Sequence, residues 1–378
     1  MPEIGAWGGM KERTDKIKVL LLASGDLWAG AEVMVHQLVL GLVKTDFVDL
    51  LVILMNKGRL ADELARLGVK VEIVDELGYS FARTIGIIQK LVWDFSPNVI
   101  HSHRYKENVL AWCVSRGRAG CTLVATQHGM PESLRSLSIT ERLRTSFFFR
   151  LLSTSFAQTV VVSEEMQRTL VNCCGFSKKN TTVIHNGITI SELVVAKRTG
   201  RLVVGSAGRL FPVKDFSLLI NIARSVVEKN NTIDFVLAGD GPELAMLEDK
   251  VGRYGLDGRF RFLGHQEDMD SFYAGLDLYI NTSIHEGIPM SVLEAMSYGL
   301  PVVAPKVGGF PEIVDEGVCG FLVEGRHPEK FAHAILRLSS FEERRRMGQA
   351  ARERAIASFS QEVMVQRYIQ LYNELSPR

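Results

Sequence analysis

Apolar and polar positions alternate in blocks at the start of the chain. Residues 17–24 form an apolar run with the length and character of a buried parallel strand. Residues 25–30 are a glycine-containing loop, and residues 31–42 have the pattern of a helix. This order of strand, glycine loop and helix is typical of the opening of a doubly wound α/β domain.

The same order returns in the second half of the chain. Residues 202–206 have strand character, residues 207–214 form a glycine-containing loop, and residues 215–227 predict a helix that Asp215 caps. Further apolar runs, most of them separated by helical stretches, predict strands at 49–55, 69–74, 99–103, 123–127, 159–162, 182–184, 234–238, 259–263, 276–281, 300–304 and 320–323. We therefore predict an α/β chain with two Rossmann-like domains in tandem.

A polar stretch at residues 190–201 is the expected domain boundary. It divides the chain into a first domain at 17–190 and a second at 200–360. Residues 1–16 are expected to be a loose tail, and residues 361–378 form a separate C-terminal segment that is largely helical.

Small and polar residues collect where the predicted strands end. In open α/β sheets, ligands bind beyond the carboxyl ends of the strands. Two such edges that face one another across a hinge predict a deep cleft between the domains.

Composition and charge narrow the class of protein. The chain has 378 residues, 46% apolar and 23% charged, which is typical of a globular protein large enough for two domains. Residues 1–200 carry a net charge of +5 and residues 201–378 one of −4, a balance that gives nucleic-acid binding no support. The basic first half could still be attracted to an anionic partner.

The start of the chain and its cysteines bear on location. No apolar run reaches the roughly 20 residues of a membrane span, and residues 1–16 lack the pattern of a secretory signal. Five cysteines without metal-ligand spacing are in keeping with reduced thiols, so we expect a cytoplasmic protein.

Glu286 and Glu294 lie eight residues apart, the first on a Gly/Pro loop and the second on the early turns of a predicted helix over 290–297. A carboxylate beside Leu293 and Met296 is costly to bury unless another group pairs with it. Together the two carboxylates could hold the hydroxyls of a sugar and a ribose. The alternative is that Glu286 is an acid favoured by a helix start and Glu294 is partly solvated.

Arg209 and Lys214 stand five residues apart on the loop that follows the first strand of the second domain. A guanidinium fork, an ammonium and unpaired amides at a helix start suit a diphosphate. The alternative is two surface cations near a turn. No Walker pattern occurs, and residues 25–30 do not match the dinucleotide fingerprint, which disfavours nicotinamide chemistry.

His128 follows a predicted strand and precedes Gly129, which permits close backbone approach. It could contact a ligand near the reacting centre, or it could be a structural hydrogen-bonding residue. We expect His101 and His103 to alternate across their strand, so that one points away from the site. Further ligands for zinc are not apparent, and no metal is expected.

Residues 133–150 combine Arg135, Arg142, Arg144 and Arg150 with three consecutive phenylalanines, Phe147 to Phe149. Such a segment could rest on an anionic membrane surface or bind an acidic acceptor. The alternative is an ordinary helix with buried phenylalanines and solvated arginines.

Several short motifs occur in a fixed order at domain-scale spacing. In the second half they are Gly208-Arg209 with Lys214-Asp215, Ala238-Gly239-Asp240-Gly241-Pro242, Glu286-Gly287-Ile288-Pro289 with Glu294-Ala295-Met296, and Gly308-Gly309-Phe310-Pro311-Glu312-Ile313-Val314. In the first half they are Ala29-Gly30-Ala31-Glu32, His101-Ser102-His103, His128-Gly129, Val162-Ser163 and Asn186-Gly187-Ile188. Together, over about residues 17–375, they resemble the retaining GT-B glycosyltransferases of family 4 (glycosyl transferases group 1).

The resemblance implies a nucleotide-sugar donor held mainly by the second domain. Arg209 and Lys214, on the loop that begins at Gly208, would neutralise the donor diphosphate, and Glu294 would accept from the ribose hydroxyls. Glu286 would hold the transferred sugar.

The resemblance also assigns the neighbours of these residues. The amides of Gly287 and Ile288 would help to hold the sugar, although Pro289 beside them has no N–H. Three other positions would contact the donor: Leu263 would border the base, and Gly30 and Ala31 would approach the diphosphate from the first domain. His128 would lie near the sugar, and the last helix would cross back onto the first domain.

The sequence departs from the family in one place, because the first loop often reads Gly-Gly and here reads Ala29-Gly30. The fit near the diphosphate could therefore differ. The family needs no divalent metal, and it implies retention by front-face attack, with the leaving diphosphate taking the acceptor proton. A glycan or glycolipid acceptor in surface polysaccharide or lipopolysaccharide synthesis is expected.

Two other classes stay open from the sequence alone. A related two-domain sugar enzyme, an epimerase or a phosphorylase, would share the fold, but no lysine-bearing pyridoxal phosphate site is apparent. A non-enzymatic sugar-binding protein of two α/β lobes usually works outside the cytosol, where a signal peptide is expected.

Overall fold

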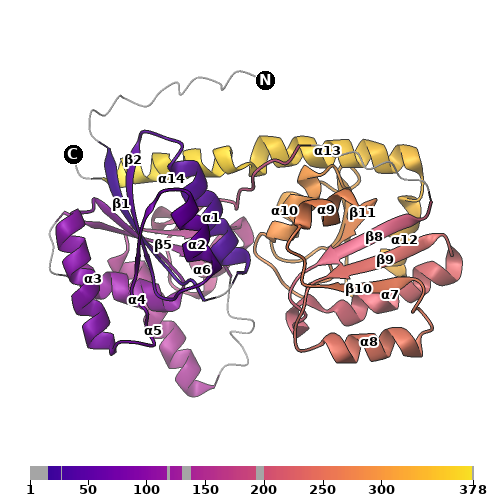
Figure 1. Cartoon of the computed structure of the whole chain (residues 1–378), viewed down its shortest axis with the longest axis horizontal. Helices are drawn as coiled ribbons and strands as arrows, with labels where there is room; N and C mark the ends of the chain where they lie inside the picture. The colour runs from indigo at the N-terminus through magenta and orange to yellow at the C-terminus, as the bar shows by residue number, and fades with distance from the viewer. Residues whose placement is uncertain (1–15, 27, 117–119, 130–137, 193–199, 377–378) are drawn as a thin grey trace.

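The computed structural model describes residues 16–26, 28–116, 120–129, 138–192 and 200–376, and Figure 1 shows two lobes side by side. The first sheet contains β1 (Ile17–Ala23), β2 (Val48–Leu54), β3 (Lys70–Ile73), β4 (Val99–His103), β5 (Thr122–Gln127), β6 (Gln158–Val161) and β7 (Thr181–Val183). The second contains β8 (Leu202–Ala207), β9 (Ile233–Ala238), β10 (Phe260–Gly264), β11 (Leu278–Ile280), β12 (Val302–Pro305) and β13 (Gly320–Val323).

Both sheets are parallel and have the same strand order. The first runs β3-β2-β1-β4-β5-β6-β7 and the second β10-β9-β8-β11-β12-β13. The order reverses beside β1 in the first sheet and beside β8 in the second. Ligands of doubly wound folds bind at these switch points, beyond the carboxyl ends of the strands. The predicted fold class is confirmed.

Helices follow most of the strands. The first domain has α1 (Gly30–Leu42), α2 (Arg59–Arg66), α3 (Phe81–Phe95), α4 (Tyr105–Ser115), α5 (Ile139–Ser155), α6 (Glu164–Cys173) and the short η1 (Lys178–Asn180). The second has η2 (Pro212–Lys214), α7 (Phe216–Lys229), α8 (Leu244–Arg253), α9 (Met269–Ala274), α10 (Met290–Ser297), α11 (Phe310–Ile313) and α12 (Pro328–Arg337). Two long helices, α13 (Phe341–Phe359) and α14 (Gln361–Leu375), end the chain.

The apolar runs form strands because parallel sheets are covered by helices on both faces. Val19 and Leu20 of β1 are fully buried although their side chains point to opposite faces. Strand β11 is shorter than predicted. It begins two residues later than predicted, after a turn at the end of α9 in which the Leu276 amide donates to the Tyr273 carbonyl. It ends before a second turn, in which the Ser283 amide donates to the Asn281 side chain.

The last two helices connect the lobes. Figure 1 shows α13 running along the second lobe and α14 continuing over the first, where α14 packs beside α1. The Gln361 side chain donates to the Gln37 backbone carbonyl of α1 (2.8 Å), and the Gln361 backbone amide donates to the Ile188 carbonyl (2.8 Å). The tail at 1–15 and residues 193–199 of the expected boundary lie outside the described residues, and the domain limits stay a prediction.

Candidate active site

The loops after β8 and β11 meet at the switch point of the second sheet. The Thr282 hydroxyl donates to the Lys214 carbonyl (3.0 Å), and the Ile284 amide donates to the Val213 carbonyl (2.8 Å). The Lys214 stem passes over Gly208, because a Cβ placed on Gly208 would lie 3.7 Å from Lys214 Cε. These contacts bring the predicted cationic loop beside the loop of the first predicted carboxylate.

Lys214 and Glu286 form an ion pair between Nζ and Oε1, and the Ser283 hydroxyl donates to the same oxygen (2.8 Å). Their side chains are 24% and 17% exposed, so the pair is neither buried nor fully solvated. The sequence predicts a role for each residue separately. In the structure the two side chains form one ion pair, and a ligand that enters here meets both groups.

Arg209 is exposed, and its guanidinium lies over the Phe211 ring at 4.9 Å. It forms no ion pair with the residues that the structure describes. Arg209 is therefore a cation of this loop whose charge is not neutralised, beside a Lys214 that is already paired.

The two helix starts near the site differ. Asp215 caps α7, as predicted, by accepting from the Leu218 amide (3.0 Å), and Arg326 binds the other oxygen of Asp215 (3.0 Å from Nε). Less of this helix start is therefore left for a phosphate than the sequence predicts. The start of α10 has Pro289 as N-cap and no side-chain cap, so its first amides are the more open set.

Glu294 lies on α10, as predicted, and is only partly buried. Burial raises the pKa of its carboxyl group, and a hydrogen bond from the Tyr273 hydroxyl (2.7 Å) opposes that rise. Tyr273 is the partner that a carboxylate in this apolar setting requires. Leu263, expected to border a base, is half-buried at the end of β10.

The loop of Glu286 also touches the first domain. A Cβ on Gly287 would come within 2.8 Å of the Val162 side chain and 3.2 Å of the His128 carbonyl oxygen, so glycine is needed for this approach. The Asn186 side chain donates to the Ile288 carbonyl (2.8 Å). Pro289 is buried beside these residues.

The first loop of the first domain faces the start of α10. Gly30 is exposed and Ala31 is half-buried, and a Cβ on Gly30 would lie 4.0 Å from Met290 Cγ. The Ala29 amide is held by the Glu32 carboxylate (3.3 Å), which also pairs with Arg104 (2.6 Å). The structure thus brings Gly30 and Ala31 near the open helix start.

His128 belongs to a stack of three histidines. His128 Nε2 lies 3.0 Å from His103 Nδ1, and the His101 and His103 rings are 4.3 Å apart. His101 bonds the Tyr372 hydroxyl and the Thr126 hydroxyl, both at 2.7 Å. Burial lowers the pKa of His101 and of His128 to about 3 and holds that of His103 well below its usual range, so the stack is neutral at physiological pH.

The expectation that His101 and His103 point to different faces is wrong. Side chains two residues apart lie on the same face of a strand, because the side-chain repeat of a strand is two. Both histidines therefore join His128. His103 Nε2 and His128 Nδ1 are buried and have no hydrogen-bond partner in the part of the chain that the structure describes.

Several residues of the site escaped sequence reasoning. Ser283, Tyr273 and Arg326 are in contact with predicted residues but lie in no spacing that assigns them a role. Asn186 occurs in a motif of the resemblance, yet nothing local shows that its side chain crosses to the other domain. Their contacts depend on the tertiary structure.

The arginine- and phenylalanine-rich segment is helix α5 in its described part. Phe148 and Phe149 are buried, whereas Phe147 is 58% exposed, and Arg144 and Arg150 are exposed. Arg135 and the side chain of Arg142 lie outside the described residues. The helix interpretation accounts for two of the phenylalanines, and membrane contact stays a prediction.

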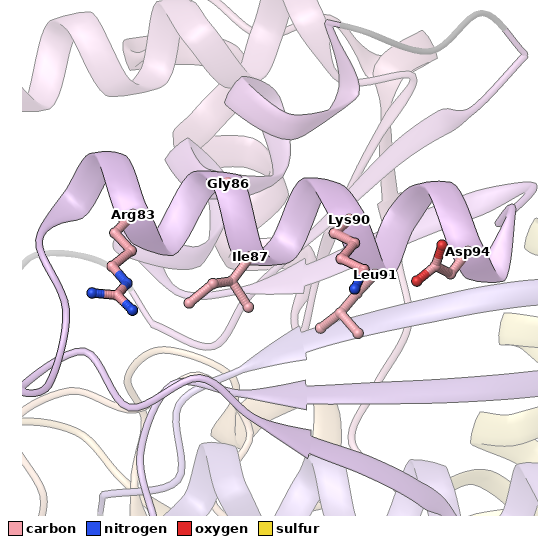
Figure 2. A pocket seen from close by; sticks show the side chains of 6 residues that line it. All are labelled: Arg83, Gly86, Ile87, Lys90, Leu91 and Asp94. Carbon is pink, nitrogen blue, oxygen red and sulfur yellow. The ribbon is translucent and has the colours of Figure 1, made fainter.

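A surface pocket lies elsewhere, on helix α3 of the first domain. Figure 2 shows its lining side chains along one side of the helix. They are Arg83, Gly86, Ile87, Lys90, Leu91 and Asp94. None of them is a predicted site residue.

The described residues contain no group of three or more His, Cys, Asp or Glu side chains that could hold a metal ion. They also contain no helix that is long and apolar enough to cross a membrane.

Comparisons with known proteins identify the family. The model "Glycosyltransferase Family 4" matches residues 28–192, and the model "Glycosyl transferases group 1" matches residues 191–354. The two matches run through both sheets. The chain belongs to the GT-B glycosyltransferases of family 4 and is a glycosyltransferase.

Individual relatives are distant. N-acetyl-alpha-D-glucosaminyl L-malate synthase of Bacillus anthracis is 33% identical over 141 residues, which are only 37% of this chain and 37% of that protein. UDP-Gal:alpha-D-GlcNAc-diphosphoundecaprenol alpha-1,3-galactosyltransferase of Escherichia coli is 24% identical over 307 residues, 76% of this chain and 78% of that one.

A solved structure has the same fold. Anabaena HepE in complex with UDP-glucose superimposes with a TM-score of 0.82 at 23% identity. The match covers 95% of this chain and 100% of that one. At this identity the likeness establishes the fold.

Proposed function

We propose that this glycosyltransferase moves a sugar from a nucleotide diphosphate sugar to a hydroxyl of a glycan or glycolipid, with retention and without a metal. The observation that carries the proposal is the arrangement at the switch point of the second sheet. The unneutralised Arg209 and the Lys214–Glu286 pair lie there on two bonded loops. A diphosphate and a polyhydroxylated sugar are the chemistry that these groups would recognise together.

The charges are placed to favour departure of the nucleotide. Negative charge grows on the leaving diphosphate as the glycosidic bond breaks, so cations stabilise the transition state more than the bound donor. Arg209 and Lys214 would take this role, with the amides at the start of α10 beside them. Gly30 and Ala31 would close on the diphosphate from the first domain.

The two carboxylates, Glu286 and Glu294, would bind the transferred sugar and the ribose of the donor. Glu286, oriented by Ser283, would accept hydrogen bonds from the transferred sugar, and the amides of Gly287 and Ile288 would help to hold it. Glu294, oriented by Tyr273, would accept from the ribose, and Leu263 would border the base. His128 would lie near the sugar as a neutral hydrogen-bonding group. In this role it is not a general acid at physiological pH.

The relatives support a UDP-sugar as the first donor to test. HepE was crystallised with UDP-glucose, and the Escherichia coli enzyme uses UDP-Gal and a diphosphoundecaprenol acceptor, as their names state. For the acceptor, we propose a glycan or a lipid-linked sugar in cell-surface polysaccharide or lipopolysaccharide synthesis.

The test is a panel of UDP-, GDP- and ADP-sugars, first by thermal shift and then by transfer to short glycan and lipid-linked acceptors. We expect stabilisation by one nucleotide class and a product whose anomeric proton in NMR has the donor's configuration. Activity should survive EDTA. An inverted product, a free 2-epimer or a sugar phosphate would contradict the proposal.

A further inference from the structure

Glu312 reaches from the second domain into the first. It lies on the four-residue helix α11, after β12. Its Oε2 accepts from the Glu164 amide (2.8 Å) and from His185 Nε2 (2.9 Å), and its Oε1 accepts from the Glu165 amide (3.0 Å). Only 13% of this side chain is exposed, so little solvent competes for these bonds.

The first-domain partner is the start of helix α6. Its first amides lack partners within the helix, and the positive end of the helix dipole favours a carboxylate. Ser163 already caps the third amide, that of Met166 (3.2 Å), and Glu312 supplies acceptors for the first two. Burial alone would raise the pKa of Glu312, but the bonds from His185 and the two amides lower it, so Glu312 is ionised.

Glu312 is itself held rigidly. Arg354 of α13 donates to the carbonyls of Ile313 (2.6 Å) and Glu312 (2.9 Å) and pairs with Asp315 (2.7 Å). The backbone of α11 is therefore fixed on the body of the second domain. Movement of the α11 backbone relative to α6 therefore requires movement of one domain relative to the other.

The segment before α11 is packed on the loop that carries Glu286. The Gly309 amide donates to the Glu286 carbonyl (3.1 Å). A Cβ on Gly308 would lie 2.0 Å from that carbonyl oxygen, and one on Gly309 would lie 1.9 Å from the Gly287 carbonyl oxygen. No side chain fits between the two segments, so they move together.

The other side of the same loop rests on the first domain. Gly287 packs on Val162 and on the His128 carbonyl, and Asn186 donates to the Ile288 carbonyl. The Glu286 loop therefore lies between two neighbours. Gly308 and Gly309, which precede Glu312, pack on one side of it, and the strand ends of the first domain pack on the other.

We propose that Glu312 is a positioning residue that holds the two domains in the register in which the Glu286 loop faces His128. The inference rests on the proposed donor site for its kinetic consequence. The domain contact itself is independent of any substrate. Asn186 assists by anchoring the loop directly.

The experiment uses the full chain with E312A and E312Q, and E324Q as the matched control. Glu324 is an exposed acid of the same domain that pairs with Lys306 on its own side. We expect kcat/KM for the donor to fall roughly tenfold or more in both Glu312 variants, as for loss of hydrogen bonds to a charged group. The radius of gyration of the unliganded chain in small-angle scattering should increase, and E324Q should match the wild type in both.

A purely structural role predicts something different, namely a lower Tm with donor kcat/KM and radius of gyration unchanged, and that result overturns the proposal. If E312A does not fold, E312Q decides, because glutamine keeps the size of the side chain. The double variant E312Q/N186A should lose less than the sum of the single losses, since both residues hold one loop. A wild type without transfer from any nucleotide sugar would refute the proposed function, while scattering would still decide the domain contact.

Discussion

The two sheets share a strand order, yet their carboxyl edges carry opposite kinds of chemistry. The second edge presents charges: Arg209, which has no counter-ion among the described residues, and Lys214, which is paired with a partly exposed Glu286. The first edge presents the histidine stack, which is buried and neutral because burial lowers the pKa of each ring. The edges meet at Gly287, which packs on the His128 carbonyl.

The difference shows that the doubly wound topology sets where a ligand binds and leaves open what the site does. At the charged edge, the loops after β8 and after β11 supply long side chains that solvent partly reaches. At the histidine edge, helix α14 covers the strands and removes water. A donor with a diphosphate would bind to the charged edge of the second sheet and be covered by the neutral edge of the first.

The largest effect is expected when Arg209, the exposed cation of the charged edge, is removed. Arg209→Ala should lower kcat roughly 100- to 1,000-fold, the loss typical of a preorganised donor to developing charge. Steady-state kinetics with the active nucleotide sugar would measure it. Arg253→Ala on α8, an exposed arginine paired with Asp249, is the control and should stay within twofold of the wild type. Equal kinetics for both variants would remove Arg209 from the site.

The second carboxylate tests whether the charged edge also holds the ribose. Glu294→Gln should raise KM for the donor roughly 10- to 100-fold, as expected for a lost charged hydrogen bond, with a smaller change in kcat. Tyr273→Phe, which removes the orienting hydroxyl, should change KM in the same direction by less. A KM unchanged by Glu294→Gln would contradict the ribose assignment.

The histidine edge should be visible in the pH dependence of stability. The pKa of His101 is about 3 in the folded chain and near 6.5 when unfolded, so the unfolded chain binds more protons between these values. The free energy of unfolding should therefore fall as pH drops below about 6.5, with about 1.4 kcal/mol per pH unit from this residue. Urea unfolding between pH 4 and 6.5 would measure the slope.

Two histidine variants separate this effect from general acid sensitivity. His101→Gln should reduce the slope by that amount, whereas His333→Gln, at an exposed position on α12, should leave it unchanged. Parallel slopes for the wild type and His101→Gln would show that the ring is not held neutral by the fold.

The smallest effect on kcat/KM is expected when the hydrogen bond from Ser283 to Glu286 is removed. Ser283→Ala removes one hydrogen bond to the carboxylate and should cost about 1 kcal/mol, roughly fivefold in kcat/KM. Ser153→Ala, which removes an exposed bond to the Arg150 carbonyl, is the control. A Ser283→Ala loss as large as that of Arg209→Ala would mean that Ser283 contacts the donor itself.

Most of the fold was predictable because burial on both faces of a sheet leaves a continuous apolar run in the sequence. Strand β4 begins and ends at the predicted residues, and Asp215 caps the predicted helix. Strand β11 was overestimated because its ends are set by turn hydrogen bonds rather than by hydrophobicity.

The sequence located candidate residues where a loop directly follows one strand, as for Arg209 and Lys214 after β8, whose roles stay a prediction. The site was not predictable where a partner comes from a distant segment. Tyr273 reaches Glu294 from another helix, and Tyr372 reaches His101 from the end of the chain. Sequence spacing contains no signal for such contacts, because they depend on how the helices pack.

Helix α14 has a consequence for the order in which the protein acquires its structure. Tyr368 and Tyr372 are fully buried against strands β4 and β5, so the hydrophobic core of the first domain includes a helix that is synthesised after the second domain. The second domain lies between these parts in sequence, and it can complete its sheet as soon as it leaves the ribosome. The first domain, although most of it is made first, has to wait for α14 and therefore completes its core after the second domain has been synthesised.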